Sequence, residues 1–249
     1  MGVHPRAAEG FSRAAAAYER GRPGYPDQAV DWLAARLGLG EGSRVADVGA
    51  GTGKLTRMLV ARGARVVALE PVAQMASVLS RAAPGAQVVR AVAEALPLAS
   101  GWARALTVAQ AFHWFDWPAA LADAHRVLGP GGGLALVWNR RRLDQPLQAA
   151  LEEALGPWRR GVPSHGDGAW RRALEASPLF GPPEEATFPY RQRLDPPGLV
   201  DRVCSTSFVA SLPPDRLAEV RRRVAGLAEG WGGEVVLDYD TEIQVCRRV

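Results

Sequence analysis

Residues 45–56, Val-Ala-Asp-Val-Gly-Ala-Gly-Thr-Gly-Lys-Leu-Thr, decide the fold of this chain. An apolar run leads into Asp47, glycines follow at alternate positions as Gly49, Gly51 and Gly53, and a helix-compatible segment comes next. Glycine permits backbone conformations and close approaches that a Cβ atom would forbid. A strand, a glycine turn and a helix in this order predict a site where a flat, polar ligand lies against the backbone, as in nucleotide-binding α/β folds.

An acidic residue, Glu70, ends the next apolar run, residues 64–70, and follows Gly49 by 21 residues. A carboxylate at the tip of the second strand of such a sheet is placed to accept hydrogen bonds from both hydroxyls of a ribose. The glycine turn and Glu70 together indicate a ligand that contains a nucleoside.

The spacing of the glycines separates three kinds of binding loop. A dinucleotide-binding loop has the pattern G-x-G-x-x-G, but here the third glycine falls one position early and Lys54 occupies its place. A phosphate-binding P-loop has the pattern G-x-x-x-x-G-K-[ST], but Val48 stands at the first glycine position and Leu55 at the hydroxyl position. The loop therefore predicts neither a phosphate cradle nor a metal.

The pattern that fits is D-x-G-x-G-x-G followed by an acidic strand end, which resembles the S-adenosylmethionine (SAM) site of class I methyltransferases. The resemblance implies SAM as cofactor. It also implies the fold: a doubly wound, mostly parallel, seven-stranded Rossmann-like α/β sheet with an antiparallel last strand and a helical cap from the N-terminus and C-terminal insertions. The first residues expected to bind the cofactor are Asp47, Gly49, Ala50, Gly51, Gly53, Glu70 and Pro71.

The composition limits the class of protein. The 249 residues are 47% hydrophobic and 22% charged, which suits one large globular α/β domain, or one domain with a cap. No apolar run is long enough for a membrane-spanning helix, and the N-terminus has no apolar signal core. The two cysteines, Cys204 and Cys246, lie far apart without a metal-binding pattern. We expect a cytoplasmic protein with no membrane partner.

The basic residues are almost all arginine. The formal net charge is +4, and Lys54 is the single lysine among 30 basic residues. The arginine runs 140–142 and 221–223 raise the alternative of nucleic-acid binding. No aromatic residue interrupts the second run, and it lies on a predicted amphipathic helix. We interpret both runs as solvated faces and expect no nucleic-acid partner.

Strand and helix patterns alternate through the first part of the chain. The predicted strands are 44–48, 65–69, 86–92, 104–110 and 133–138. The predicted helices lie near 54–62, 72–82, 118–128 and 213–229, with a broken helical stretch at 11–37. This alternation predicts a parallel, doubly wound sheet whose ligands bind at the carboxyl ends of the strands.

Three regions follow from this pattern. Residues 1–40 form a predicted N-terminal helical lid, and residues 41–139 form the SAM-binding core. Residues 140–249 form a C-terminal part with cap helices and a final pair of antiparallel strands, 184–194 and 234–247. Apolar residues alternate with more polar ones in the last of these strands, which is typical of a strand with one buried face.

Other matches to the family follow the second, third and fourth strands. An A-E-x-L-P segment resembles one whose backbone meets the adenine edge, which assigns Ala93 and Glu94 to the cofactor. Many relatives carry an acid just before the alanine, where this chain has Val92. Met75 matches a position that packs on adenine, with helix core as the alternative, and Gln110 at the end of the fourth strand joins the cofactor set.

Two segments narrow the resemblance to small-molecule methyltransferases related to trans-aconitate methyltransferase. They are Tyr-Glu-Arg-Gly-Arg-Pro-Gly-Tyr-Pro at 18–26 and Ala-Gln-Ala-Phe-His-Trp-Phe-Asp at 109–116. The likeness covers about residues 11–140, and Arg104 departs from it because relatives usually start the fourth strand with Asp. The residues expected to line the methyl-transfer and substrate region are Tyr18, Arg22, Tyr25, His113 and Trp114. Of these we predict Tyr18, His113 and Trp114 as catalytic, and Arg22 as a cofactor contact.

Methyl transfer from SAM depends mainly on positioning, because the sulfonium already activates the methyl group. The protein must hold a nucleophile in line and exclude water. A carboxylate nucleophile needs no base, whereas a base would accelerate attack by a hydroxyl or amine about 10²–10⁴-fold. His113 is the candidate base because imidazole titrates near neutrality. Its alternative role is structural, with the ring packed beside Trp114.

We therefore predict a SAM-dependent methyltransferase that acts on a small molecule. An anionic acceptor, O-methylated on a carboxylate, is expected because Arg22 and the run 140–142 lie near the ligand edge and arginine pairs with carboxylates. The alternatives are that these arginines face solvent, or that Arg22 binds the cofactor's own carboxylate. Two other functions stay open: methylation of RNA or protein, favoured by the basic balance, and SAM binding without catalysis. The identity of the acceptor and the oligomeric state do not follow from the sequence.

Overall fold

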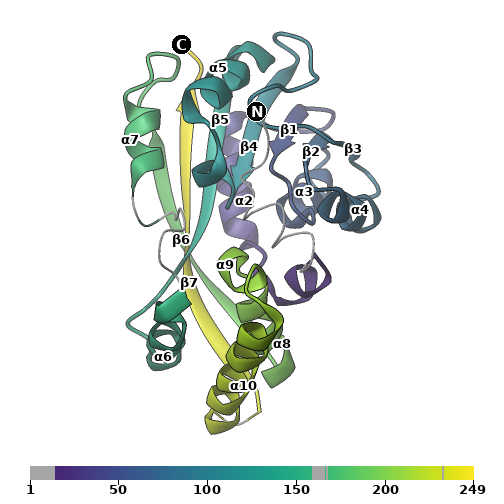
Figure 1. Cartoon of the computed structure of the whole chain (residues 1–249). Helices are drawn as coiled ribbons and strands as arrows, with labels where there is room; N and C mark the ends of the chain where they lie inside the picture. The colour runs from purple at the N-terminus through teal and green to yellow at the C-terminus, as the bar shows by residue number, and fades with distance from the viewer. Residues whose placement is uncertain (1–14, 159–165, 167, 232) are drawn as a thin grey trace.

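The computed structural model describes residues 15–158, 166, 168–231 and 233–249. A single seven-stranded sheet forms its centre, with the order β3-β2-β1-β4-β5-β7-β6 (Figure 1). The strands are β1 (Arg44–Val48), β2 (Arg65–Leu69), β3 (Gln87–Val89), β4 (Ala103–Ala109), β5 (Leu128–Arg141), β6 (Glu184–Leu194) and β7 (Val235–Arg247).

The strand directions follow from the connections between the strands. Strands β1 to β5 pair in parallel because a helix or long crossover returns the chain between them. Strand β7 runs antiparallel to both of its neighbours, β5 and β6. The prediction of a mostly parallel, seven-stranded, Rossmann-like sheet with an antiparallel last strand is thus confirmed.

The helices cover both faces of the sheet and one end of the molecule (Figure 1). A helical segment at 15–21 comes first among the described residues. The α-helices that follow are α2 (Asp27–Leu37), α3 (Lys54–Val60), α4 (Ala73–Ala82), α5 (Trp117–Val127), α6 (Pro146–Leu155), α7 (Ala169–Glu175), α8 (Pro196–Cys204), α9 (Ser207–Ala210) and α10 (Pro214–Gly230). The short 3₁₀ turns named among the described residues are η1 (Phe112–Trp114) and η2 (Gly156–Trp158).

Alternate strand residues enter two separate cores, because successive side chains of a strand point to opposite faces. On one face, Val45 and Val66 pack with Leu33 of α2 and Leu59 of α3. The other face packs against α5 and α7, and its buried side chains include Trp138. Both faces are therefore covered, and the carboxyl ends of β1, β2 and β4 are the open edge where a ligand can approach the backbone.

A third core lies away from this sheet centre. Helices α6, α8, α9 and α10 gather around the far ends of β6 and β7, at the lower end of Figure 1. Leu151, Val203, Phe208, Val224 and Tyr239 are buried together there. Helix α7, from the same part of the sequence, instead packs beside α5 against the main sheet. We call α6, α8, α9 and α10 the cap.

The observed strands differ in length from the predicted ones for topological reasons. Strand β3 covers only Gln87–Val89 of the predicted 86–92, because it lies at the sheet edge and pairs with β2 alone. Strand β5 runs from Leu128 to Arg141, beyond the predicted 133–138, because Leu128 also pairs with β4 and residues 139–141 continue the pairing with β7. The start of the predicted lid, residues 1–14, lies outside the described residues, as does 159–165.

Within the described ranges, no helix combines the length and the apolar character needed to cross a bilayer. The same ranges contain no group of three His, Cys, Asp or Glu side chains arranged to hold a metal ion. Cys204 and Cys246 are both free and buried.

Candidate functional site

The loop from β1 to α3 holds its glycines in the left-handed region, at φ 66° for Gly49, 59° for Gly51 and 87° for Gly53. The three differ in what a side chain would meet. A Cβ on Gly49 would lie 2.7 Å from Ala111 Cβ, and one on Gly53 would lie 2.4 Å from Leu79 Cδ1. A Cβ on Gly51 would meet only the Tyr18 ring, at 3.9 Å. Gly51 therefore faces open space, whereas Gly53 is required for packing.

Glu70 fixes the shape of this loop. Its Oε2 accepts a hydrogen bond from the Gly51 amide and its Oε1 accepts one from the Val72 amide, each at 2.9 Å. The side chain is buried, and burial raises the pKa of Glu70. The carboxylate thus joins the end of β2 to the glycine turn after β1, so the two predicted motif elements are in direct contact.

Asp47 lies one layer deeper, at 1% exposure. Its oxygens accept hydrogen bonds from the hydroxyls of Thr56, at 2.5 Å, and Thr107, at 2.7 Å. Burial raises the pKa of Asp47 to about 6 in spite of these bonds. Because Thr56 belongs to α3 and Thr107 to β4, the carboxylate ties β1 to its neighbours beneath the loop.

A first cavity opens above the glycine turn, between the ends of β1, β2 and β4. Most of the predicted cofactor and methyl-transfer residues line it: Tyr18, Gly49, Gly51, Glu70, Pro71, Met75, Ala93, Glu94, Gln110 and Trp114. Val92 also lines it, at the position where relatives carry an acid. Met75 is 2% exposed and packs with Ala15 and Val72, so it is both a helix-core residue and part of the cavity wall.

A second, smaller cavity continues under the N-terminal segment and is lined by Arg22, Tyr25, Asp47, Ala50 and Thr52, among others. Two buried polar atoms of its lining have no hydrogen-bond partner among the described residues, Arg22 Nε and Thr52 Oγ1. A buried polar group without a partner is costly. The pair therefore fits a ligand with both an acceptor and a donor, such as an amino-acid end.

The loop at 21–26 is held in place by strands from the distant part of the sequence. Asn139 Nδ2 donates to the Gly24 carbonyl, and Gln192 Nε2 donates to the Gly21 carbonyl, each at 2.8 Å. Arg22 Nη2 donates to the Ser205 carbonyl at 2.9 Å, and its guanidinium lies 4.9 Å from the Tyr18 ring. Burial, followed by the charge of Arg202, lowers the pKa of Arg22 to about 10.

An ion-pair cluster fixes the helical segment at 15–21 over the site. Lys54 Nζ donates to the Glu19 carbonyl at 2.9 Å, and Arg57 Nη1 pairs with Glu19 Oε1 at 2.8 Å. Lys54, at the position where a dinucleotide loop has its third glycine, therefore serves to attach this segment to α3. The attachment brings Tyr18 to the mouth of the first cavity.

A third cavity, of about 770 Å³, lies between these strand ends and the cap. Tyr18, Gln110 and Trp114 line both this cavity and the first one. Of the three cavities, His113 lines only the third. The His113 ring lies 4.8 Å from the Trp114 ring and 5.5 Å from the Trp138 ring. Gln110 is the one described non-glycine residue at positive φ, 59°, a conformation that tertiary contacts must stabilise.

The structure thus brings together all the predicted site residues except Gly53, which lines none of the three cavities. Sequence reasoning missed Thr52, Asn139 and Arg202. Asn139 follows the apolar run of the fifth strand. Because strand ends of a parallel sheet face the ligand, the sequence could have indicated Asn139 in the same way as it indicated Gln110. Thr52 lies inside the quoted loop. No local pattern distinguishes Arg202 from the other arginines.

Comparisons with known proteins identify the family of this chain. A family model described as a methyltransferase domain matches residues 46–136. An uncharacterised methyltransferase of Mycobacterium bovis is 40% identical over 216 residues, which are 86% of this chain and 81% of that protein. The structure of an Anaeromyxobacter dehalogenans protein with an inferred type II methyltransferase activity shares the fold at TM-score 0.69 and 22% identity, covering 91% of this chain and 97% of that one.

More distant relatives match about half of the chain. A trans-aconitate 2-methyltransferase of an Azoarcus species is 34% identical over 134 residues, 51% of this chain and 50% of that protein. A malonyl-[acyl-carrier protein] O-methyltransferase of Enterobacter lignolyticus is 35% identical over 128 residues, 49% of this chain and 51% of that protein. The predicted kinship with trans-aconitate methyltransferase is therefore distant. The chain itself belongs to the class I SAM-dependent methyltransferases.

Proposed function

We propose that this enzyme transfers the methyl group of SAM to a small molecule bound in the third cavity. The observation that carries the proposal is the border between the cavities: Tyr18, Gln110 and Trp114 line both the first and the third. A donor in the first cavity and an acceptor in the third would meet at these side chains. Tyr18 and Trp114 are the proposed catalytic contacts, and their role is to orient the two ligands and to exclude water.

The first two cavities together suit the two ends of SAM. We assign the nucleoside end to the first cavity, where Met75, Ala93 and Glu94 line the wall and Glu70 ends β2. We assign the amino-acid end to the second cavity, where the unpartnered Arg22 Nε would donate to the carboxylate of SAM. A guanidinium–carboxylate pair of this kind is a strong, charge-assisted hydrogen bond. SAM, when bound, supplies the activated methyl group.

We further propose that the acceptor is a carboxylate that is O-methylated without an obligatory base. Two observations support this. His113 is packed against Trp114 and Trp138, as expected of a structural ring. The two relatives that match about half of the chain are a malonyl-[acyl-carrier protein] O-methyltransferase and a trans-aconitate 2-methyltransferase, and malonyl and trans-aconitate groups both carry carboxylates.

Calorimetry and turnover test this function in two steps. SAM and S-adenosylhomocysteine (SAH) are expected to bind, and NAD is not, because the loop lacks the dinucleotide spacing. Incubation with methyl-labelled SAM and a panel of small carboxylic acids, alcohols and amines should then label an acid. Binding of NAD without binding of SAM would overturn the cofactor assignment. Binding of SAM without turnover on any acceptor would favour the non-catalytic alternative.

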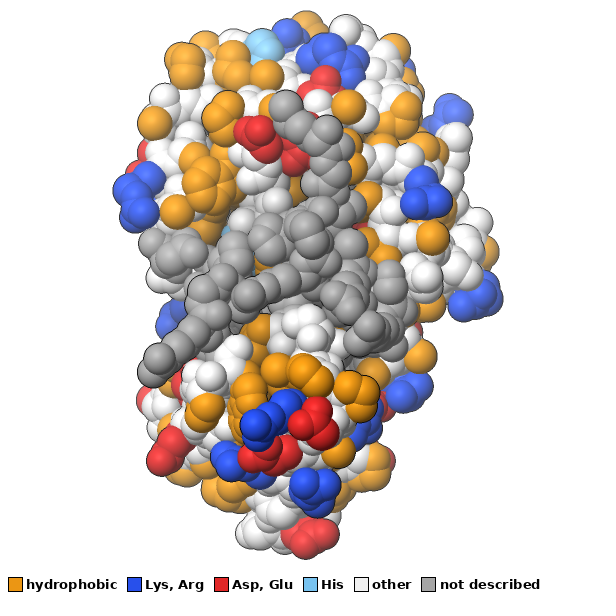
Figure 2. All heavy atoms as spheres, viewed as in Figure 1, with side chains coloured by type: hydrophobic (Ala, Val, Ile, Leu, Met, Phe, Trp, Pro, Cys, Tyr) orange, Lys and Arg blue, Asp and Glu red, His pale blue; other side chains and the backbone are white. Residues whose placement is uncertain are grey.

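Methylation of RNA is the second candidate, and the charge distribution speaks against it. Figure 2 shows basic and acidic side chains interspersed over the cap on the face in view, rather than a basic patch. Arg223 and Arg216 of α10 both pair with Glu219. RNA labelling whose rate falls steeply between low and moderate salt would support the alternative, because polyanion binding releases counterions.

A further inference from the structure

The third cavity has walls of two kinds. On one side, apolar side chains of α6, α8, α9 and β7 belong both to the cap core and to the cavity lining. They are Leu151, Leu155, Val203, Phe208 and Leu237, all buried. The lining also includes charged residues from the end of β5 and from β7. The cavity volume, about 770 Å³, is in the range that holds a molecule with an extended body.

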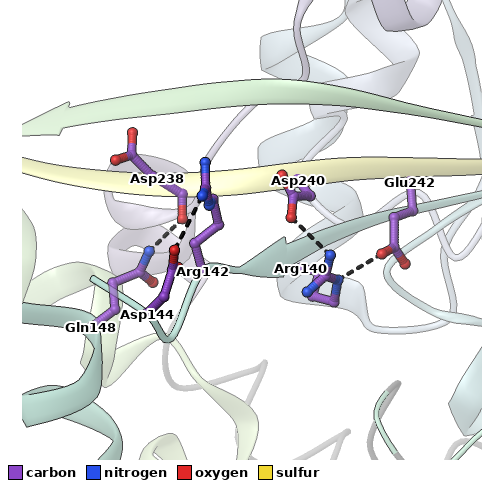
Figure 3. A network of polar contacts seen from close by, with 7 residues as sticks. All are labelled: Arg140, Arg142, Asp144, Gln148, Asp238, Asp240 and Glu242. Carbon is purple, nitrogen blue, oxygen red and sulfur yellow. Dashed lines mark hydrogen bonds and ion pairs between the residues drawn. The ribbon is translucent and has the colours of Figure 1, made fainter. Parts of the chain in front are cut away.

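The arginine run at the end of β5 has its charge neutralised within the chain (Figure 3). Arg140 lies between Asp240, at 2.8 Å, and Glu242, at 2.6 Å. Arg142 pairs with Asp144 at 3.1 Å. Arg141 pairs with Glu152 of α6. The expectation that this run receives the acceptor's carboxylate therefore gains no support, because each guanidinium already has a carboxylate partner.

Arg202 is different. It lies in the last turn of α8, lines the second and third cavities, and forms no ion pair with any described carboxylate. Its single side-chain hydrogen bond to a described residue runs from Nε to Tyr239 Oη, at 2.9 Å. Tyr239 Oη in turn donates to Gln192 Oε1 at 3.2 Å. The guanidinium is therefore held at its Nε side, and both terminal nitrogens stay available to a ligand.

The helix that carries Arg202 is fixed at both of its ends. Asp195 caps the start of α8 by accepting from the Gly198 amide at 2.8 Å, with prolines in the first turn. Ser205 at the other end accepts from Arg22 through its carbonyl. Arg202 is thus presented beside Arg22 by rigid elements, at the border between the proposed donor and acceptor sites.

We propose that Arg202 binds the single carboxylate of an amphipathic monocarboxylic acid whose apolar body lies along the cap wall. This inference rests on the proposed function and names the acceptor class. Among the arginines that line the third cavity, Arg22 is assigned to SAM and the run 140–142 is paired with carboxylates. Arg202 therefore remains as the arginine without an acidic partner among the described residues. A second carboxylate would lie among paired charges that include Asp144 and Asp240, and its desolvation would have no compensating partner.

The reaction balances without any further group. One carboxylate oxygen forms a bond to the methyl carbon as the methyl–sulfur bond breaks, and the electron pair of that bond stays on sulfur. The carboxylate charge and the sulfonium charge are both lost, giving a neutral ester and SAH. No proton moves, so Arg202 orients one oxygen of the carboxylate while the other attacks.

Matched acids test the acceptor class. Decanoate, decanedioate and butanoate differ only in the number of carboxylates or the length of the body. With methyl-labelled SAM, we expect decanoate to be esterified with kcat/KM at least about tenfold above the other two, from the burial of its chain and the lack of a second charge. Decanedioate or butanoate equalling decanoate would overturn the inference. So would calorimetry that detects no decanoate binding to the SAH complex.

Substitutions test the residue. Arg202→Met should raise the KM for decanoate at least about tenfold, and Arg202→Lys should restore part of it. Because Arg202 also borders the second cavity, SAH affinity can fall as well, but by clearly less than the KM rises. Arg222→Met, on the exposed side of α10, is the control and should change neither value. An unchanged KM, or an equal loss of SAH affinity, would overturn the assignment of Arg202. Failure of the wild-type enzyme to bind SAM or SAH would instead refute the proposed function itself.

Discussion

The proposed SAM site and the proposed acceptor site are formed by different parts of the protein. We call them the two halves of the ligand region. At the proposed SAM site, backbone atoms and glycines at the ends of neighbouring strands shape the cavity, and Glu70 holds them through main-chain amides. At the proposed acceptor site, side chains from the cap and the last strand form the walls. The first cavity is lined by residues from Tyr18 to Phe115, whereas the third also joins residues of the cap and of the last strand, as far as Asp240.

This difference separates residues that cannot be substituted without changing the backbone from residues that can be substituted without changing the fold. A site made of backbone and glycine binds one ligand and tolerates little change, because each substitution alters the path of the chain. A cavity lined by cap side chains changes its ligand when a side chain changes, while the sheet below is unaffected. We therefore expect substitutions in the two halves to separate cofactor affinity from acceptor affinity.

The largest effect is expected from Gly51→Val. The branched side chain would enter the first cavity, so SAH affinity measured by calorimetry should fall more than about 100-fold. Gly42→Val is the matched control, since Gly42 also has a positive φ, 73°, and a Cβ there would meet no atom within 4 Å. Both variants carry a similar strain of about 1–2 kcal/mol. Equal SAH affinity in the two variants would contradict the role of Gly51.

Asp47→Asn tests the buried layer under the loop through its pH dependence. The pKa of Asp47 is about 6 in the folded protein against an ordinary 3.8, so the folded state holds this proton more tightly than the unfolded chain. Its contribution to stability is complete below about pH 4 and is lost as the pH rises through 6. Between pH 4 and 7 the wild type should lose on the order of 2–3 kcal/mol relative to the variant.

Urea unfolding of both proteins at the two pH values measures this difference. Asp215→Asn, at an exposed position of α10, should behave as the wild type does. A wild type and an Asp47→Asn variant with parallel pH profiles would show that Asp47 does not titrate in this range.

Glu70→Ala should weaken SAH binding by about 1–3 kcal/mol, the scale for leaving buried polar groups without partners. The loss has two sources, because the substitution removes an expected ribose acceptor and also releases the amides of Gly51 and Val72. Calorimetry with SAH measures the loss of affinity. Arg202→Met, from the proposed acceptor site, is the comparison. Similar losses in both variants would mean that the two halves do not act separately.

The smallest effect is expected from His113→Ala. If the acceptor is a carboxylate, kcat should fall less than about tenfold and stay nearly independent of pH around neutrality, because no proton has to be removed. The assay is labelled-ester formation with SAM saturating. A loss near a thousandfold with SAH affinity intact would instead identify His113 as a base acting on a hydroxyl or amine.

The sequence alone indicated the glycine turn, the strand ends around it and most of the lining of the first cavity. Alternate glycines, Asp47 and Glu70 are local signals, and parallel strands with helical crossovers allow one arrangement in which their carboxyl ends meet. The parallel sheet followed from these signals, and the lining of the first cavity followed from them together with the resemblance to the family. The different roles of Gly51 and Gly53 did not follow from the sequence. Gly53, at the start of α3, lies against Leu79 of α4, and only the packed fold brings these helices together.

Only the tertiary structure decided the acceptor half. Nothing in the run 140–142 shows that its charges are neutralised, because Glu152, Asp240 and Glu242 reach it from other elements. Nothing in the sequence around Arg202 shows that it lacks an acidic partner among the described residues. Charge in a cavity depends on which side chains lie within a few ångströms, and neighbours of that kind are set by chain topology rather than by local pattern.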